Sequence, residues 1–142
     1  MSTMKAELTL EGEVQWRAQA GSGHSLIIDG PVDAGGEDAG FRPMELMLLS
    51  LGGCLGYDTV MILRKMRHDV IGYQLTLIGE RAEGLPAVYT DVKIEHVIRG
   101  HGLTPEVVQK ALALAEQKYC SAWAMFAKTA KLTNNFRIEN IS

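Results

Sequence analysis

The stretch from Pro43 to about Met66 constrains the fold of this chain most, because it predicts one long and almost wholly apolar helix. Proline suits the first turn of a helix, and about 24 residues at 1.5 Å each give a length of roughly 36 Å. Residues 46–57 carry no charge, but a membrane span needs about 20 such residues, so the run indicates a core helix. Because the helix is apolar on nearly every side, we expect other elements to wrap it.

Glycines crowd this helix around its first cysteine, in the sequence LSLGGCLGYD. Glycine costs a helix interior about 1 kcal/mol relative to alanine, so the cluster needs a structural reason. Gly52 and Gly56 are four positions apart and form one bare strip on the helix. We expect this strip to let the backbone of a second long helix cross close to Cys54. The plainer alternative is that the glycines only permit tight packing.

Alternating apolar and polar residues predict strands on both sides of the long helix. Residues 5–18 alternate with a period of two, which is typical of a half-buried antiparallel strand, with a bend at Gly12. A loop rich in Gly, Asp and Ala is predicted over residues 30–40. Further strand patterns cover residues 24–29, 71–77 and 88–99, and a last strand has Phe136 and Ile138 facing inward.

Two shorter helices are predicted between the last two of these strands. Thr104 is the expected N-cap and Pro105 the first helical residue of one, and Ser121 is the expected cap of the other. The order of elements predicts an α+β fold with a mostly antiparallel sheet. The length fits a single domain over residues 1–142.

The charge balance and the N-terminal sequence exclude several classes of partner and location. Fourteen Lys and Arg against 17 Asp and Glu leave a net charge of -3, so no basic footprint for nucleic acid is present. We expect neither nucleic-acid binding nor membrane association. The first residues contain no apolar secretory segment, so we expect a cytoplasmic protein whose cysteines are reduced at rest.

Metal and phosphate sites are not expected from local motifs. The four histidines show no ligand spacing, and the chain has no Cys-x-x-Cys motif, so we expect no metal site. His96 falls on the apolar side of its strand, where a histidine is usually a hydrogen-bonded core residue. No glycine-rich loop precedes a Lys-Ser/Thr helix start.

With metal and phosphate sites set aside, the two cysteines, Cys54 and Cys120, are the remaining candidate reactive residues. A free cysteine is often just a small buried hydrophobe. However, Cys120 directly precedes a predicted helix start, where backbone amides favour a thiolate, and Cys54 lies in the glycine cluster. Periodicity alone leaves both interpretations open.

The sequences around both cysteines resemble the OsmC (osmotically inducible protein C) family and its organic hydroperoxide resistance relatives. PMELMLLSLGGC, from residue 43 to residue 54, resembles the opening of that family's central helix. AEQKYCS, from residue 115 to residue 121, resembles its second cysteine motif. The order of elements is also similar, so the resemblance covers essentially the whole chain. It implies the OsmC-like fold, with mostly antiparallel sheets wrapped around two long central helices in an intertwined homodimer.

The resemblance also implies a thiol peroxidase that reduces organic hydroperoxides in the oxidative stress response. Cys54 would be the peroxidatic cysteine and Cys120 the resolving one, and the two would form a disulfide. An external dithiol would reduce that disulfide. The family typically uses lipoylated proteins for this step, so we expect one as the reductant. No bound cofactor is implied.

The chain departs from the family pattern at two positions. In the characterised peroxidases a glutamate directly follows the proline and pairs with an arginine, but here Met44 has that position and Glu45 lies roughly 100° further round the helix. Our candidate catalytic pair is Glu45 with Arg42, and Arg17 is the other arginine considered. The second motif usually reads Cys-Pro, but Ser121 follows Cys120 here.

Two other functions therefore stay open beside the peroxidase. The chain could be a non-peroxidatic OsmC-like protein that binds a small apolar or thiol-reactive ligand at the dimer interface. It could also use its cysteines only as core residues. For the peroxidase and for the ligand-binding protein alike, we expect an apolar pocket beside the cysteines. Its expected lining residues are Met44, Met47, Leu51 and Tyr57.

Overall fold

The computed structural model describes residues 2–142, and its contacts divide the chain into two compact units, residues 1–47 and 48–142. The single domain over residues 1–142 stays a prediction.

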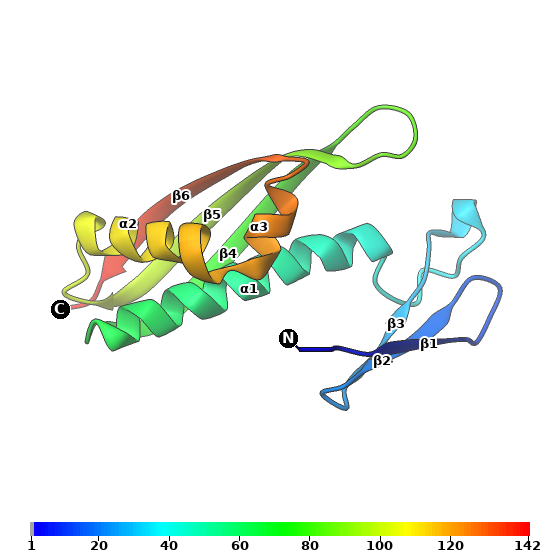
Figure 1. Cartoon of the computed structure of the whole chain (residues 1–142), viewed down its shortest axis with the longest axis horizontal. Helices are drawn as coiled ribbons and strands as arrows, with labels where there is room; N and C mark the ends of the chain where they lie inside the picture. Colours follow the sequence, from blue (N-terminus) through cyan, green and yellow to red (C-terminus); the bar gives the residue numbers. More distant parts are fainter. Residues whose placement is uncertain (1) are drawn as a thin grey trace. The chain divides into compact units, whose positions relative to one another are not determined.

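The first unit is built on a three-stranded antiparallel sheet in the order β1-β2-β3 (Figure 1). The predicted bend near Gly12 is confirmed as a turn, in which the Glu11 amide donates to the Gln15 carbonyl at 2.8 Å. The expectation of a half-buried first strand is wrong for the single chain, because every residue of β1 is exposed. The bounds of the strands are Ala6–Leu10 for β1, Trp16–Ala20 for β2 and Ser25–Ile28 for β3.

The predicted loop over residues 30–40 is present and is organised around Asp29. This carboxylate is only 3% exposed and accepts hydrogen bonds from the backbone amides of Gly30, Glu37 and Ala39. These three hydrogen bonds hold the pKa of Asp29 below its usual value, and the bond from the Gly30 amide has the largest effect. The loop includes one short 3-10 turn, η1 (Val32–Ala34).

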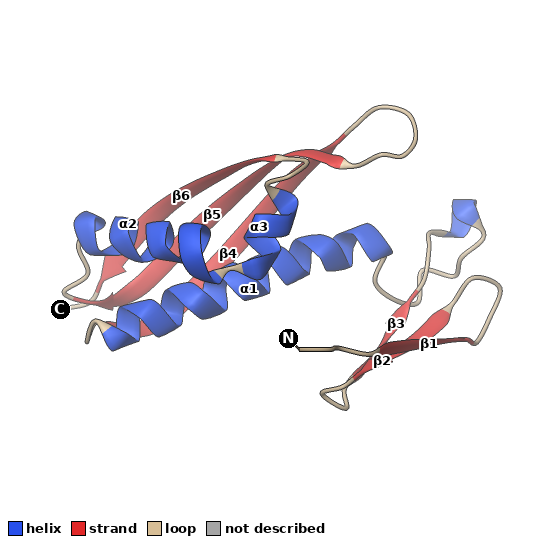
Figure 2. Cartoon of the chain, in the orientation of Figure 1, coloured by secondary structure: helices blue, strands red, loops and turns tan. Residues whose placement is uncertain are grey.

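The second unit has a three-stranded sheet in the order β4-β5-β6, with helices against it (Figures 1 and 2). β4 and β5 pair antiparallel, as predicted, whereas β6 pairs parallel to β5. The α+β class with mostly antiparallel pairing is therefore confirmed. The strands are β4 (Asp69–Arg81), β5 (Tyr89–His101) and β6 (Lys131–Asn140).

The predicted helices are all present. Thr104 caps α2 as expected, because its side chain accepts from the Val107 amide at 3.3 Å. α2 continues into one π-helical turn, η2, before the chain bends into α3. The bounds are α1 (Pro43–Lys65), α2 (Pro105–Leu114), η2 (Ala115–Tyr119) and α3 (Ser121–Phe126).

The main core of the second unit lies where α1 and α2 pack on the sheet. Phe136 and Ile138 pack against this core from β6, as predicted. The cluster consists of Leu63, Val70, Ile98, Leu103, Val108, Ala111 and Leu112.

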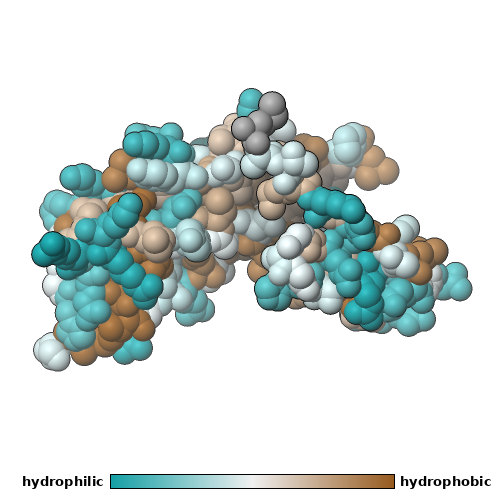
Figure 3. Space-filling view, turned by 60° about the horizontal axis from the view of Figure 1, so that its bottom comes forward, coloured by the Kyte–Doolittle hydropathy of each residue, from teal (hydrophilic) through white to brown (hydrophobic). Residues whose placement is uncertain are grey.

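One face of α1 is buried, and the rest of the helix is open within the chain. Leu49, Tyr57 and Met61 are 53%, 69% and 45% exposed. The elements of the single chain therefore cover only one face of the helix, and the expectation that other elements wrap it stays a prediction for the proposed dimer. Figure 3 shows brown apolar side chains among the teal ones on the second unit, at the left of the view. By length and composition alone α1 could cross a membrane, but the core helices of globular proteins pass the same test.

The glycine strip of α1 faces the sheet rather than a second helix of the chain. A Cβ atom on Gly52 would lie 2.6 Å from Leu77 Cδ1, and one on Gly56 would lie 2.7 Å from Leu75 Cδ1. A Cβ atom on Gly53 would meet nothing within 4 Å. Within this chain, the close approach that the glycines permit is therefore made by two leucine side chains of β4.

A chain of polar side chains crosses the interior between the sheet and the helices. His96 is 1% exposed, and its Nδ1 lies 2.6 Å from the Tyr73 hydroxyl, while its Nε2 lies 2.7 Å from Asn134 Oδ1. The Asn134 amide in turn donates to Glu116. The prediction of a hydrogen-bonded core histidine is confirmed. Burial lowers the pKa of His96 and raises that of Tyr73, so both are neutral near pH 7.

We predict that Gly52→Leu destabilises the protein. The new side chain would overlap Leu77, and overpacking of this kind costs about 1–3 kcal/mol. Urea unfolding would measure the loss. Gly53→Ala is the control, because it enters open space and gains about 1 kcal/mol of helix propensity. A Gly52→Leu protein as stable as the wild type would contradict the packing account.

We predict that His96 makes the protein less stable as the pH falls below about 6.5, the ordinary pKa of histidine. Below that pH His96 is protonated in the unfolded chain but stays neutral in the folded chain, because folding lowers the pKa of His96. The slope approaches about 1.4 kcal/mol per pH unit. In His96→Gln, this part of the slope between pH 6.5 and 5 should disappear in unfolding experiments. An unchanged slope would show that other groups cause the acid sensitivity.

Candidate functional site

Cys54 lies near the middle of α1 and is partly exposed. The packing of Gly52 and Gly56 against β4 fixes which side of the helix meets the sheet. Asp58 is one helical turn beyond Cys54, on the same face of α1. The thiol and the carboxylate are thus presented together.

Cys120 lies at the junction between η2 and α3, and it is only 3% exposed. Its backbone is extended, and its sulfur accepts a hydrogen bond from the Trp123 amide at 3.3 Å. Cys120 is therefore the N-cap of α3, and the prediction that Ser121 caps this helix is wrong. The cap position falls one residue earlier because the π-helical turn ends at Tyr119.

The structure brings the two cysteines together with Asp58. The two sulfur atoms and a carboxylate oxygen of Asp58 all lie within 4.8 Å of one another. Burial raises the pKa of Cys120 to about 12, and the neighbouring Cys54 and Asp58 act in the same direction, against the Trp123 amide. Cys120 is therefore a neutral thiol near pH 7.

Such an arrangement can perform dithiol chemistry. A thiol that is partly exposed can meet a small oxidant, and a second sulfur at this separation can then form a disulfide after a small movement of the side chains. The same sulfur and oxygen atoms also form a set that could bind a soft divalent cation.

Asp58 was missed in the sequence analysis. Its spacing of four residues from Cys54 on a predicted helix was a usable signal, because such residues share a face. Nothing local indicated that Cys120 would join them.

Arg42 and Glu45, the other two predicted catalytic residues, lie in the first unit around the start of α1. They pair with each other, with Arg42 Nε 3.6 Å from Glu45 Oε1. Arg42 also lies 3.6 Å from the Asp38 carboxylate. Arg17, the alternative arginine, pairs with Glu11 at 2.9 Å. The catalytic roles of Arg42 and Glu45 stay predictions.

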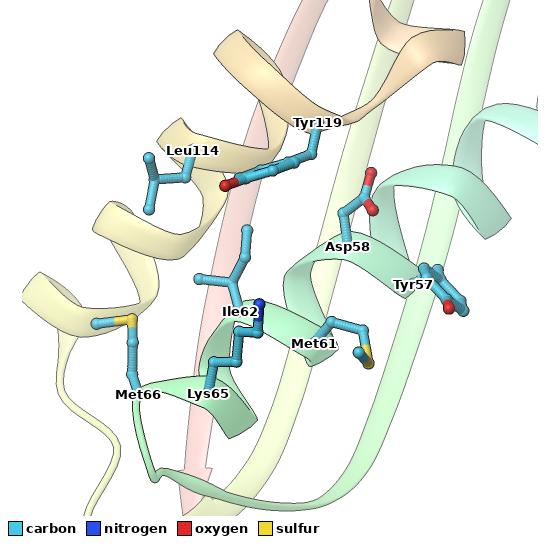
Figure 4. A pocket seen from close by; sticks show the side chains of 8 residues that line it. All are labelled: Tyr57, Asp58, Met61, Ile62, Lys65, Met66, Leu114 and Tyr119. Carbon is cyan, nitrogen blue, oxygen red and sulfur yellow. The ribbon is translucent and has the colours of Figure 1, made fainter.

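A pocket of about 360 Å³ opens between α1 and the segment formed by α2 and η2 (Figure 4). Asp58 points from α1 toward the segment that carries Tyr119, so the pocket shares Asp58 with the cysteine cluster. Its walls are mostly apolar and include two methionines. The lining residues are Tyr57, Asp58, Met61, Ile62, Lys65, Met66, Leu114 and Tyr119.

Of the predicted lining of the apolar pocket, Tyr57 is confirmed, Leu51 is wrong, and Met44 and Met47 stay predictions. Tyr57 lines the pocket described above, whereas Leu51 is fully buried on the inner side of α1. Met44 and Met47 belong to the first unit. A further groove of about 410 Å³ runs along α1 and β4 past Gly53 and Tyr73. The sequence analysis predicted only lining residues on α1. It did not predict that Leu114 and Tyr119, from α2 and η2, would line the same pocket.

The comparisons with known proteins agree with this architecture. The family described as "OsmC-like protein" matches residues 35–134. Protein YhfA of Escherichia coli K12 is 31% identical over 135 residues, which cover 91% of this chain and 98% of YhfA.

Two solved structures illustrate the similarity of the fold. A hypothetical protein from Aquifex aeolicus VF5 superposes with a TM-score of 0.88 at 29% identity, over 100% of both chains. An organic hydroperoxide resistance protein OsmC from Legionella pneumophila superposes with a TM-score of 0.72 at 14% identity, over 96% of this chain and 97% of its own. With its two cysteine motifs, this fold and the match over residues 35–134, the chain belongs to the OsmC-like protein family.

Proposed function

We propose that this protein is a cysteine-based thiol peroxidase that reduces organic hydroperoxides through a Cys54–Cys120 disulfide, in defence against oxidative stress. The observation that carries the proposal is the closeness of the two sulfur atoms, which come from separate elements and lie within 4.8 Å. Membership of the OsmC-like family supports it, as does a similar fold in proteins named for organic hydroperoxide resistance.

The exposure of the two thiols supports different roles for them in the proposed reaction. Cys54 is partly exposed and would be the peroxidatic residue, whereas Cys120 is buried and held as a thiol. The Cys54 thiolate attacks the terminal oxygen of the hydroperoxide, so that an S–O bond forms, the O–O bond breaks and Cys54 becomes a sulfenic acid. The departing alkoxide takes a proton from solvent and leaves as the alcohol. The Cys120 sulfur then attacks the sulfenic acid, loses its proton and displaces water, which leaves the disulfide.

The apolar pocket suits an organic peroxide better than hydrogen peroxide. Met61, Ile62, Met66 and Leu114 can cover an alkyl or aryl group, and Asp58 connects this pocket to the cysteine cluster. Burial of that group adds about 25 cal/mol per Å² of apolar surface to binding. Hydrogen peroxide has no such group to bury.

Arg42 and Glu45 are proposed as catalytic residues through the resemblance of the Pro43 motif to the family pattern. Their ion pair, with 3.6 Å between Arg42 Nε and Glu45 Oε1, would hold the Arg42 guanidinium in a fixed orientation. A cation of this kind would favour the attacking thiolate and the departing alkoxide. Regeneration needs an external dithiol, for which we propose a lipoylated protein, and the cytoplasm is the compartment in which reduced cysteines fit.

A homodimer is proposed as the working form. Several large apolar side chains of α1 and β4 are about half exposed or more, and apolar side chains gathered on a surface often mark a protein–protein interface. A second copy of the chain would cover α1 and so complete its burial. The exposed residues concerned are Leu49, Tyr57, Met61, Ile71 and Ile78.

A second candidate function is non-peroxidatic binding of a small apolar or thiol-reactive ligand. The observation that favours it is the Asp58 carboxylate beside both thiols, because a negative charge disfavours a thiolate. Met44 also favours this function, because the resemblance implies that the family's glutamate at this position pairs with the catalytic arginine, and methionine cannot form that ion pair. The pocket between α1 and α2 would then be the ligand site.

We predict that one equivalent of cumene hydroperoxide removes both thiols of the reduced protein and yields a Cys54–Cys120 crosslink. Thiol counting and mass spectrometry would measure this. Cys54→Ser should abolish the reaction, and Cys120→Ser should stop it at a sulfenic acid on Cys54. If both thiols of the wild type survive, the peroxidase is refuted and the ligand-binding function is favoured.

The same assay tests the proposed ion pair. Arg42→Gln should slow the loss of thiols by at least tenfold, because removal of one electrostatic donor commonly costs that much or more. Arg67→Gln is the matched control, since Arg67 lies after the end of α1 and has no proposed role. Equal rates for the two variants would remove Arg42 and Glu45 from the mechanism.

We predict that the wild-type protein sediments as a dimer and that Leu49→Asp shifts it toward monomer. A carboxylate in an apolar interface is costly to bury. Val32→Asp, which alters an apolar side chain that is 72% exposed on η1, should leave the dimer intact. A monomeric wild type at micromolar concentration would contradict the proposed assembly.

A further inference from the structure

We infer that the reduced protein binds a zinc ion through Cys54, Asp58 and Cys120. These residues offer two sulfur atoms and one carboxylate oxygen, all within 4.8 Å of one another. The inference uses the same thiols as the proposed peroxidase but does not depend on its turnover.

The separation of the ligand atoms suits a tetrahedral site. Zinc binds sulfur at about 2.3 Å and carboxylate oxygen at about 2.0–2.2 Å, so its ligand atoms lie roughly 3.5–3.8 Å apart. The three atoms here are already within about 1 Å of that spacing. Rotation of the partly exposed Cys54 and Asp58 side chains can close the difference, while the buried Cys120 stays in place.

The chemistry of the three groups favours zinc over harder cations. Calcium and magnesium prefer all-oxygen sites, whereas two thiolates with one carboxylate suit a borderline-soft ion. Each thiol gives its proton to solvent when it binds the metal, and the charge of the ion offsets the repulsion among three negative groups.

The open fourth position would face the pocket. Three protein ligands leave one position of a tetrahedral ion for water or for a ligand. Asp58 lies both in the cluster and in the lining of the pocket between α1 and α2, and this pocket supplies the path of entry.

Metal binding and disulfide formation would exclude each other, because both use the same two sulfur atoms. Zinc would therefore protect the thiols from peroxide, and oxidation would release the ion. This differs from the sequence-based expectation of no metal site. That expectation rested on local spacing, whereas Cys120 is brought to Cys54 and Asp58 only by the fold.

The test uses the full, reduced chain with Co²⁺ as a spectroscopic probe and Zn²⁺ in competition with a chromophoric chelator. We expect thiolate-to-cobalt charge-transfer absorption at one ion per chain. Asp58→Asn should weaken Zn²⁺ binding at least tenfold, and the control Glu95→Gln, an exposed carboxylate on β5, should not change it. Prior oxidation to the disulfide should abolish binding.

The inference is overturned if the wild type gives no charge-transfer absorption, or if Asp58→Asn binds Zn²⁺ as tightly as Glu95→Gln. Should Asp58→Asn fail to fold, Cys120→Ser decides, because its hydroxyl can still accept from the Trp123 amide while the cobalt absorption should weaken. Zinc binding without peroxide-induced thiol loss would refute the peroxidase alone. Thiol loss without zinc binding would refute the metal site alone.

Discussion

The contact between α1 and β4 is the constraint on which the site depends. Gly52 and Gly56 let the side chains of Leu77 and Leu75 approach the helix closely. This contact fixes the rotation of α1 about its axis, since only a bare strip can face the sheet at that distance. Cys54 and Asp58 are consequently held together on one face of the helix.

The second part of the site depends on how the chain leaves α2. A π-helical turn ends at Tyr119, and Cys120 then takes an extended conformation in which its sulfur caps α3. A hydrogen bond from a backbone amide and the burial of the side chain hold that sulfur beside Cys54. One cluster of two thiols and a carboxylate thus supports both of the chemistries proposed here, disulfide formation and zinc binding, and its redox state would select between them.

The exposed surface of α1 lies on the same helix as Cys54, so the proposed homodimer would affect the thiol site. Residues such as Leu49 and Met61 are about half exposed on the same helix that carries Cys54. A second copy that covers them would also change how solvent and peroxide reach the thiol. The exposed apolar surface and Cys54 therefore belong to one helix, and variants in α1 should be tested for both assembly and thiol reactivity.

The sequence by itself determined the elements of the fold and the resemblance to the OsmC family. Period-two alternation located the strands, Pro43 and Thr104 marked helix starts, and the cysteine motifs identified the thiols, because all of these depend on local chemistry. Only the tertiary structure decided that β6 runs parallel to β5, that Cys120 rather than Ser121 caps α3, and that Asp58 joins the two sulfurs. The pairing of β6 with β5 and the approach of Cys120 to Cys54 and Asp58 arise from contacts between residues far apart in the chain, about which the spacing of neighbouring residues carries no information. The cap at Cys120 depends on the π-helical turn that precedes it, which the sequence pattern did not predict.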